Sequence, residues 1–151
     1  MAMATEPCPL CPPTRPVLAE NEDWRLVLNE NQATLGRVYF ALKRHETDVT
    51  ALAPGEVLSL WRFAARAKRA LDSLFAPDHF NYLFHMNVTP HVHMHIYPRY
   101  KAPRAFAGQT FTDTRCGDHY DPQEVSVLDA VTDTLLVNAL REALAAQEGR
   151  E

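Results

Sequence analysis

The fold of this chain is predicted from the segment Pro90-His91-Val92-His93-Met94-His95-Ile96-Tyr97-Pro98. Its histidines occupy every second position with apolar residues between them, which is the pattern of a half-buried strand. We expect Val92, Met94 and Ile96 to face a core. The three histidines would then line the opposite face over about 13 Å, at roughly 3.3 Å per residue. Imidazole titrates near neutral pH, binds metals and can attack phosphorus, so this row predicts a functional site.

Two other interpretations of the histidine row remain open. Histidines on a strand are often only polar surface, although three in register on an apolar strand are costly without a function. His91 and His93 could also chelate a catalytic metal ion, as in cupin-like barrels. That arrangement needs many glycine-rich strands, and the two substantial helices predicted below argue against it.

Composition indicates one globular domain over residues 1–151. The chain is 46% hydrophobic and 23% charged, with a formal net charge of −4, which argues against a general nucleic-acid-binding surface. No apolar run approaches the roughly 18 residues that span a membrane. Residues 1–6 have neither the basic nor the hydrophobic region of a secretory signal, and three cysteines do not suggest a disulfide framework. We therefore expect a cytoplasmic protein with no membrane partner.

The proline-rich segment 7–16 excludes a regular helix or a central strand, and it carries Cys8 and Cys11 as a Cys-x-x-Cys pair. Two thiolates at this spacing can coordinate one tetrahedral zinc ion. A redox pair is disfavoured because no βα unit follows, and two inert thiols are the third interpretation. We assign residues 1–20 to an N-terminal loop.

Alternation and turn residues predict a hairpin from strands at 24–29 and 36–42, followed by a helix that begins at 53–56 and stops at 76–78. The third strand is expected over 79–87.

Val88-Thr89-Pro90 is a short connection, so strand 79–87 and the histidine strand should be antiparallel neighbours with Asn87 beside the histidine row. Residues 98–120 lack periodicity and predict a long loop. Asp121-Pro122-Gln123-Glu124 resembles a helix start, which predicts a C-terminal helix over 121–147.

The strand 91–97 resembles the motif that names the histidine triad (HIT) family, and the similarity extends to the Cys-x-x-Cys loop, the hairpin ending at Lys43-Arg44-His45, the first helix and the strand with Asn87. The C-terminal helix lies outside it. The resemblance implies an α+β fold with a five-stranded antiparallel sheet and one central helix, and a homodimer. It also implies a small-molecule nucleotide substrate, cleaved at the phosphorus that carries the nucleoside, and no organic cofactor.

By position in the family motif, His93 would be the nucleophile and His95 would contact the bridging oxygen of the bond that breaks. His91 would support the site, Asn29 would contact the ribose and Asn87 the phosphate. Proton donation by His95 would need an imidazolium, so we expect activity to depend on pH near neutrality.

Zinc-containing relatives use a Cys-x-x-Cys, a histidine at the end of the hairpin and the first triad histidine. The resemblance therefore implies a closed structural zinc site formed by Cys8, Cys11, His45 and His91.

The chain also departs from the family pattern. Val88-Thr89-Pro90 replaces a longer glycine-rich loop, and Gly36-Arg37 stands where relatives often have Gly-His. The third position of the triad is His95 and not glutamine, which favours hydrolysis over nucleotidyl transfer. Tyr97 and Arg99 resemble the branch of bacterial zinc-containing diadenosine-polyphosphate hydrolases. We therefore expect a hydrolase of dinucleoside polyphosphates or related AMP conjugates. The alternatives are a nucleoside phosphoramidase and a non-catalytic nucleotide-binding module.

Overall fold

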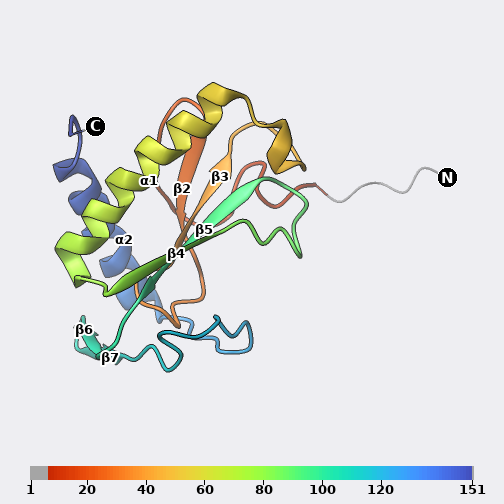
Figure 1. The fold of residues 1–151 in the computed structure, drawn as a ribbon. Coiled ribbons are helices and arrows are strands. Elements are labelled where there is room, and N and C mark those ends of the chain that lie inside the picture. Colours follow the sequence, from red (N-terminus) through yellow and green to blue (C-terminus); the bar gives the residue numbers. More distant parts are fainter. Residues whose placement is uncertain (1–6, 151) are drawn as a thin grey trace.

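A five-stranded antiparallel sheet, with two helices against it, forms the centre of the computed structural model, which describes residues 7–150 (Figure 1). The strand order is β1-β2-β3-β5-β4, so the expected α+β fold is confirmed. The elements are β1 (Val17–Glu20), β2 (Trp24–Leu28), β3 (Val38–Leu42), a 3₁₀ turn (Val49–Ala51), α1 (Pro54–Phe75), β4 (His79–Leu83), β5 (His93–Arg99), β6 (Arg104–Phe106), β7 (Gln109–Phe111) and α2 (Ala130–Ala146).

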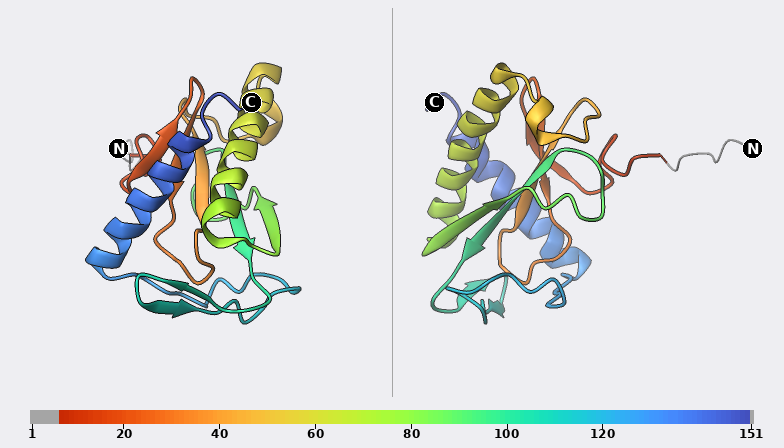
Figure 2. Two further views of the ribbon diagram at one scale, coloured as in Figure 1. Left: turned by 90° about the vertical axis from the view of Figure 1, so that its left-hand side faces the viewer. Right: turned by 45° about the vertical axis from the view of Figure 1, so that its right-hand side comes forward.

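Both helices cover the same face of the sheet, as the two views of Figure 2 show. Val92, Met94 and Ile96 are fully buried beneath them, as the alternation of the histidine segment predicts. They join a core built from α1, α2 and the inner strands. Burying apolar side chains is the main source of folding free energy, and here it fixes which face of β5 carries the histidines.

The opposite face of the sheet carries the histidines and is partly covered by the N-terminal loop. Leu10 of this loop packs in a small second cluster with Val27, Tyr39 and Ala41. This contact brings the Cys-x-x-Cys segment next to the hairpin and β5.

Helix α1 begins and ends where the sequence predicts. The Glu56 carboxylate accepts a hydrogen bond from the Ala53 backbone N–H at 2.8 Å and so caps the first turn. Ala76 ends the helix in the left-handed conformation, with φ of 45°.

The turn between β2 and β3 depends on Gln32 and Gly36. The fully buried Gln32 amide donates to the carbonyls of Asn29 and Arg37 at 2.8 and 2.9 Å and accepts from the Gly36 N–H at 2.8 Å. Gly36 has φ of +83°, and a Cβ there would lie 2.8 Å from Leu71. Only glycine fits this position without strain, and the turn delivers Arg37 to the start of β3.

The predicted start of the C-terminal helix is wrong. Helix α2 begins at Ala130 and is capped by Asp129, whose carboxylate accepts from the Thr132 N–H at 2.9 Å. Asp121 instead caps a turn, with its carboxylate accepting from the Gln123 N–H at 2.9 Å. The chain after that turn is held by Asn31, whose side-chain oxygen accepts from the Ser126 N–H at 3.0 Å. Tertiary hydrogen bonds therefore prevent the local cap signature from starting a helix there.

Three other boundaries also differ from the prediction. Residues 17–20 form edge strand β1, whereas 1–20 was expected to be a loop; its residues 1–6 lie outside the described part. Strand β4 ends at Leu83 instead of Asn87, and three residues later Met86 adopts φ of 50°, which lies outside the extended range of a strand. The expected loop 98–120 begins with the end of β5 and contains the β6–β7 hairpin.

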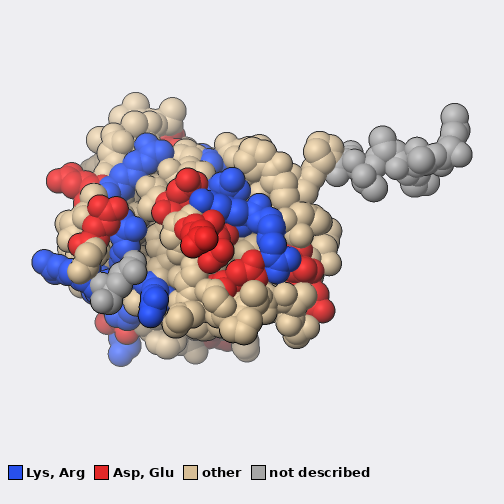
Figure 3. Space-filling model, turned by 90° about the horizontal axis from the view of Figure 1, so that it is seen from above, with Lys and Arg blue, Asp and Glu red and all other residues tan. Residues whose placement is uncertain are grey.

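Acidic and basic side chains are interspersed on the face seen from above in Figure 3. On that face the basic side chains do not form the continuous surface that nucleic-acid binding requires.

Candidate active site

His93 and His95 lie side by side on β5, with ring centroids 5.0 Å apart, and both line a cavity of about 480 Å³. Asn29, which follows β2, and Asn87, in the connection between β4 and β5, line the same cavity. The structure therefore brings together all four side chains predicted to contact substrate. His91 lies elsewhere, in the cluster of possible metal ligands described below.

A backbone hydrogen bond orients His93. The Nδ1 atom of this ring lies 2.6 Å from the carbonyl oxygen of His91, which only accepts, so Nδ1 carries the proton. The Nε2 atom then carries the free lone pair, which is the form of imidazole that acts as a nucleophile. Any positive charge that develops on the ring lies beside the same carbonyl oxygen.

His95 occupies an environment that disfavours its charged form. Burial is the main cause, and the nearby Arg37 charge, then His93 and His85, add to it; together they lower the pKa of His95 to about 2. Its Nδ1 is buried and forms no hydrogen bond within residues 7–150. The expectation of an imidazolium that titrates near neutral pH is therefore not supported for the free protein. A neutral His95 still has one N–H to donate.

The two asparagines are held differently. The Asn29 side-chain oxygen accepts from the Asn31 N–H at 2.9 Å, which leaves its NH₂ group as the available donor. Asn87 is exposed on the short connection before the histidine strand.

The cavity is also lined by residues that were not among the predicted site residues, and those with aromatic or charged side chains are Arg37, His85, Tyr97 and Tyr120. Tyr97 continues the alternation of the triad, so the sequence carried a signal for it. Arg37 stands out in the sequence only as a departure from the family pattern. Tyr120 follows a segment without periodicity, and no local signal connects it to the histidines.

Cys8, Cys11, His45 and His91 form a compact cluster whose four candidate ligand atoms lie within 4.8 Å of one another. The Nδ1 of His91 is 3.4 Å from Cys8 Sγ, 3.3 Å from Cys11 Sγ and 3.2 Å from His45 Nδ1. A tetrahedral zinc ion with bonds of about 2.0–2.3 Å places its ligand atoms about 3.3–3.8 Å apart. The cluster therefore fits zinc.

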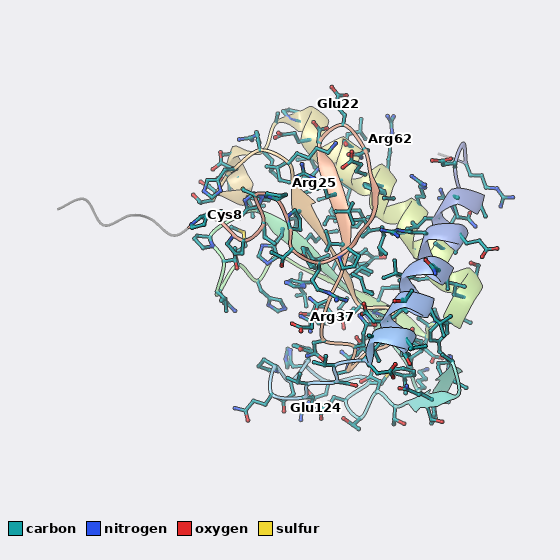
Figure 4. All side chains as sticks on the ribbon, turned by 180° about the vertical axis from the view of Figure 1, so that it is seen from behind. Cys8, Glu22, Arg25, Arg37, Arg62 and Glu124 are labelled. Carbon is teal, nitrogen blue, oxygen red and sulfur yellow. The ribbon has the colours of Figure 1, made fainter. Side chains whose placement is uncertain are left out.

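The orientation of the His91 ring supports the same conclusion. Its Nε2 lies 2.8 Å from the Leu42 carbonyl and must donate to it, so Nδ1 presents a lone pair to the two thiols. Such a hydrogen bond behind the ring is typical of histidine ligands. Cys8 and Cys11 lie in the N-terminal loop, His45 follows β3 and His91 precedes β5 (Cys8 is labelled in Figure 4). The cluster therefore links distant parts of the chain.

A sheet of this order, with alternating histidines on an internal strand, is the architecture of a class of α+β domains that generally hydrolyse or bind nucleotides. The HIT domain profile matches residues 14–102, more than half of the chain. The chain belongs to the histidine triad family.

Solved structures of histidine triad proteins share this fold. A zinc-bound family member from Mycobacterium smegmatis is 20% identical over 95% of both chains, with a TM-score of 0.64. A hypothetical histidine triad nucleotide-binding protein from Sulfolobus tokodaii is 16% identical, with 86% of this chain and 83% of that chain covered and a TM-score of 0.66. A histidine triad protein from Marinobacter aquaeolei is 16% identical over 87% and 90% of the chains, with a TM-score of 0.68. At these identities the likeness establishes the fold.

Comparison with functionally curated proteins gave no match. No helix within residues 7–150 is long and apolar enough to cross a membrane.

Proposed function

We propose that the protein is a hydrolase that cleaves a dinucleoside polyphosphate, or a related AMP conjugate, at the phosphorus that carries the nucleoside. The observation that carries this proposal is the hydrogen bond from His93 Nδ1 to the His91 carbonyl, which leaves Nε2 as a nucleophile in a histidine that lines the cavity. A binding module has no need of a nucleophile held in this way.

In the first step the Nε2 lone pair of His93 forms a bond to the α-phosphorus while the bond from phosphorus to the bridging oxygen breaks. The bonding electrons leave with that oxygen on the departing phosphate chain. The imidazole becomes cationic because it keeps its Nδ1 proton, and the His91 carbonyl stabilises that charge.

In the second step a water molecule attacks the same phosphorus, the N–P bond breaks, and its electron pair returns to Nε2. AMP is released and the water gives up one proton to solvent. The covalent intermediate is an advantage because it divides one difficult displacement into two easier ones.

The neighbouring groups have distinct roles in this proposal. His95, as a neutral N–H donor, contacts the bridging oxygen as charge develops on it. Asn87 donates to a non-bridging phosphate oxygen, and Asn29 holds the ribose through its NH₂ group. Amide and imidazole donors that are already positioned stabilise the transition state without reorganisation.

Zinc, held by Cys8, Cys11, His45 and His91, has a structural role in this proposal. Four protein ligands fill the tetrahedron, so the ion would supply no reaction chemistry and would tie the N-terminal loop to the sheet. Cysteines that bind a metal as thiolates, and form no disulfide, are compatible with the reducing environment of the cytoplasm.

The test is incubation with diadenosine tetraphosphate and, in parallel, with an adenosine phosphoramidate, followed by measurement of released AMP. We expect AMP from the first substrate, and a decrease of roughly 10³-fold or more for His93→Ala with zinc content unchanged. His79→Ala is the matched control, because this exposed histidine of β4 does not line the cavity.

The other outcomes separate the alternatives. Release of AMP only from the phosphoramidate would identify a phosphoramidase. Nucleotide binding without turnover of either substrate would identify a binding module. Loss of the bound metal together with activity in His93→Ala would favour a catalytic metal site.

A further inference from the structure

Arg37 places a buried positive charge at the cavity without an acidic partner. Its side chain is 8% exposed and lines the cavity together with His93 and His95. It forms no ion pair with any carboxylate of residues 7–150, whereas Arg99, which is 3% exposed, pairs with Asp113 at 2.7 Å. A buried charge is costly unless it is paired, so a cation in this position points to an anionic ligand.

The side chains around Arg37 are neutral. Its two terminal nitrogens donate to the phenol oxygens of Tyr120 at 2.7 Å and of Tyr97 at 3.0 Å. The guanidinium also lies over both rings, 4.7 and 4.5 Å from their centroids. Burial raises the pKa of Tyr97 to about 12, so this phenol does not ionise to neutralise the charge.

The guanidinium keeps donors for a ligand. Each terminal nitrogen carries two hydrogens, and the structure uses one of each for a phenol. The Nε atom has no hydrogen-bond partner within residues 7–150. Such a fork matches the oxygens of a phosphate group.

Strand register places Arg37 next to the histidine row. Tyr39 of β3 is paired with His95 of β5. Arg37 lies two residues before Tyr39, so it shares that face of the sheet and lies beside Tyr97, the next residue of the row after His95. In Figure 4, Arg37 lies between the sheet and the segment that carries Glu124.

We propose that Arg37 binds a second phosphate of the substrate, the neighbour in the polyphosphate chain of the phosphate that His93 attacks. This inference rests on the proposed function and narrows it. A dinucleoside polyphosphate offers this second phosphate, whereas a nucleoside phosphoramidate has only one. Arg37 is thus the residue that selects the substrate class.

The test is titration calorimetry with AMP, with α,β-methylene-ADP, which carries a second phosphate on a bond that is not hydrolysed, and with adenosine 3′,5′-bisphosphate. We expect the methylene analogue to bind at least about tenfold more tightly than AMP, because each hydrogen bond to a charged group adds affinity. Arg37→Gln should abolish this preference and change AMP binding far less. Arg62→Gln, which removes the same charge from an exposed position on α1, should keep it.

If Arg37→Gln does not fold, the inference can still be tested with Arg37→Lys and with the wild-type protein. Arg37→Lys keeps the charge without the fork, and we expect a smaller preference than in the wild type. Equal binding of AMP and the methylene analogue by the wild type would overturn the inference alone. So would a gain confined to the 3′,5′-bisphosphate, which would place the second phosphate on the ribose. Failure of all three nucleotides to bind would overturn the proposed function as well.

Discussion

In the free protein His95 is a neutral imidazole, because burial and the Arg37 charge both oppose protonation of its ring. The sequence shows only a histidine in a row of three, and an isolated imidazole has a pKa of about 6.5. The charges that lower its pKa are those of Arg37, just before β3, of His93 on the same strand, and of His85 in the connection between β4 and β5. The titration of a site residue is therefore a tertiary property.

This lowered pKa has a consequence for stability. Since the unfolded chain takes up a proton at His95 below about pH 6.5 and the folded chain does so only near pH 2, folding loses stability as the pH falls below 6.5. We expect the unfolding free energy of the wild type to fall by about 2 kcal/mol more than that of His95→Gln between pH 7.5 and pH 5. Urea denaturation at the two pH values measures the difference. Equal pH dependence in both proteins would contradict the assigned environment.

At the scale of elements, the N-terminal loop depends on the cluster of cysteines and histidines. Leu10 is its main apolar contact with the sheet, and two of the four ligands lie within the loop itself. The other contacts lie at the end of the loop, where Arg15 pairs with Asp133 at 2.7 Å and the Leu28 N–H donates to the Pro16 carbonyl. For the part around Cys8 and Cys11, metal binding and folding should therefore be coupled.

We therefore expect the purified protein to contain one zinc ion per chain. Cys8→Ser should lose the metal and at least about 3 kcal/mol of unfolding free energy, because the binding energy of a structural metal contributes to folding. Metal analysis and thermal denaturation, with Cys116→Ser as the control, measure both effects. A metal-free wild type, or a Cys8→Ser variant with unchanged metal content, would contradict the expected site.

At the scale of the whole molecule, one side of the protein carries exposed apolar side chains beside an open sheet edge. Leu58 and Trp61 of α1 are 51% and 50% exposed, and Trp61 contacts Tyr82 of β4, with ring centroids 6.4 Å apart. Strand β4 is the last strand of the sheet, so its outer edge has backbone groups available for another strand. The expectation of a homodimer is compatible with this surface.

We predict that two copies associate through this surface about a twofold axis. Light scattering after size-exclusion chromatography should give the mass of a dimer for the wild type and of a monomer for Trp61→Glu. Leu135→Glu on α2, a residue of similar exposure elsewhere, should remain dimeric. A monomeric wild type, or a dimeric Trp61→Glu, would refute this interface.

The sequence predicted those features that are governed by local patterns. The alternation of residues 91–97 identified β5 and its buried face, and the spacing of apolar residues with Pro54 identified α1. The start of α2 was misplaced because the signature at Asp121 is satisfied within a turn, while Asn31 holds the chain that follows. Arg37 and Tyr120, 83 residues apart, meet only in the folded chain, so no local pattern predicts their contact.

The segment between β7 and α2 reaches the cavity from outside the part of the chain that matches the family. Tyr120 and Pro122 line the cavity, and the family match ends at residue 102. Arg99 of β5 pairs with Asp113 of this segment and donates to the Arg115 and Asp118 carbonyls, and Asn31 and Gln32 of the β2–β3 turn bond to its backbone at Glu124 and Ser126. Since most of these bonds use backbone groups of the segment, its other side chains are free to vary while the histidines stay in place. Divergence of this appended segment is thus a route by which related proteins acquire different substrates without any change in the catalytic strand.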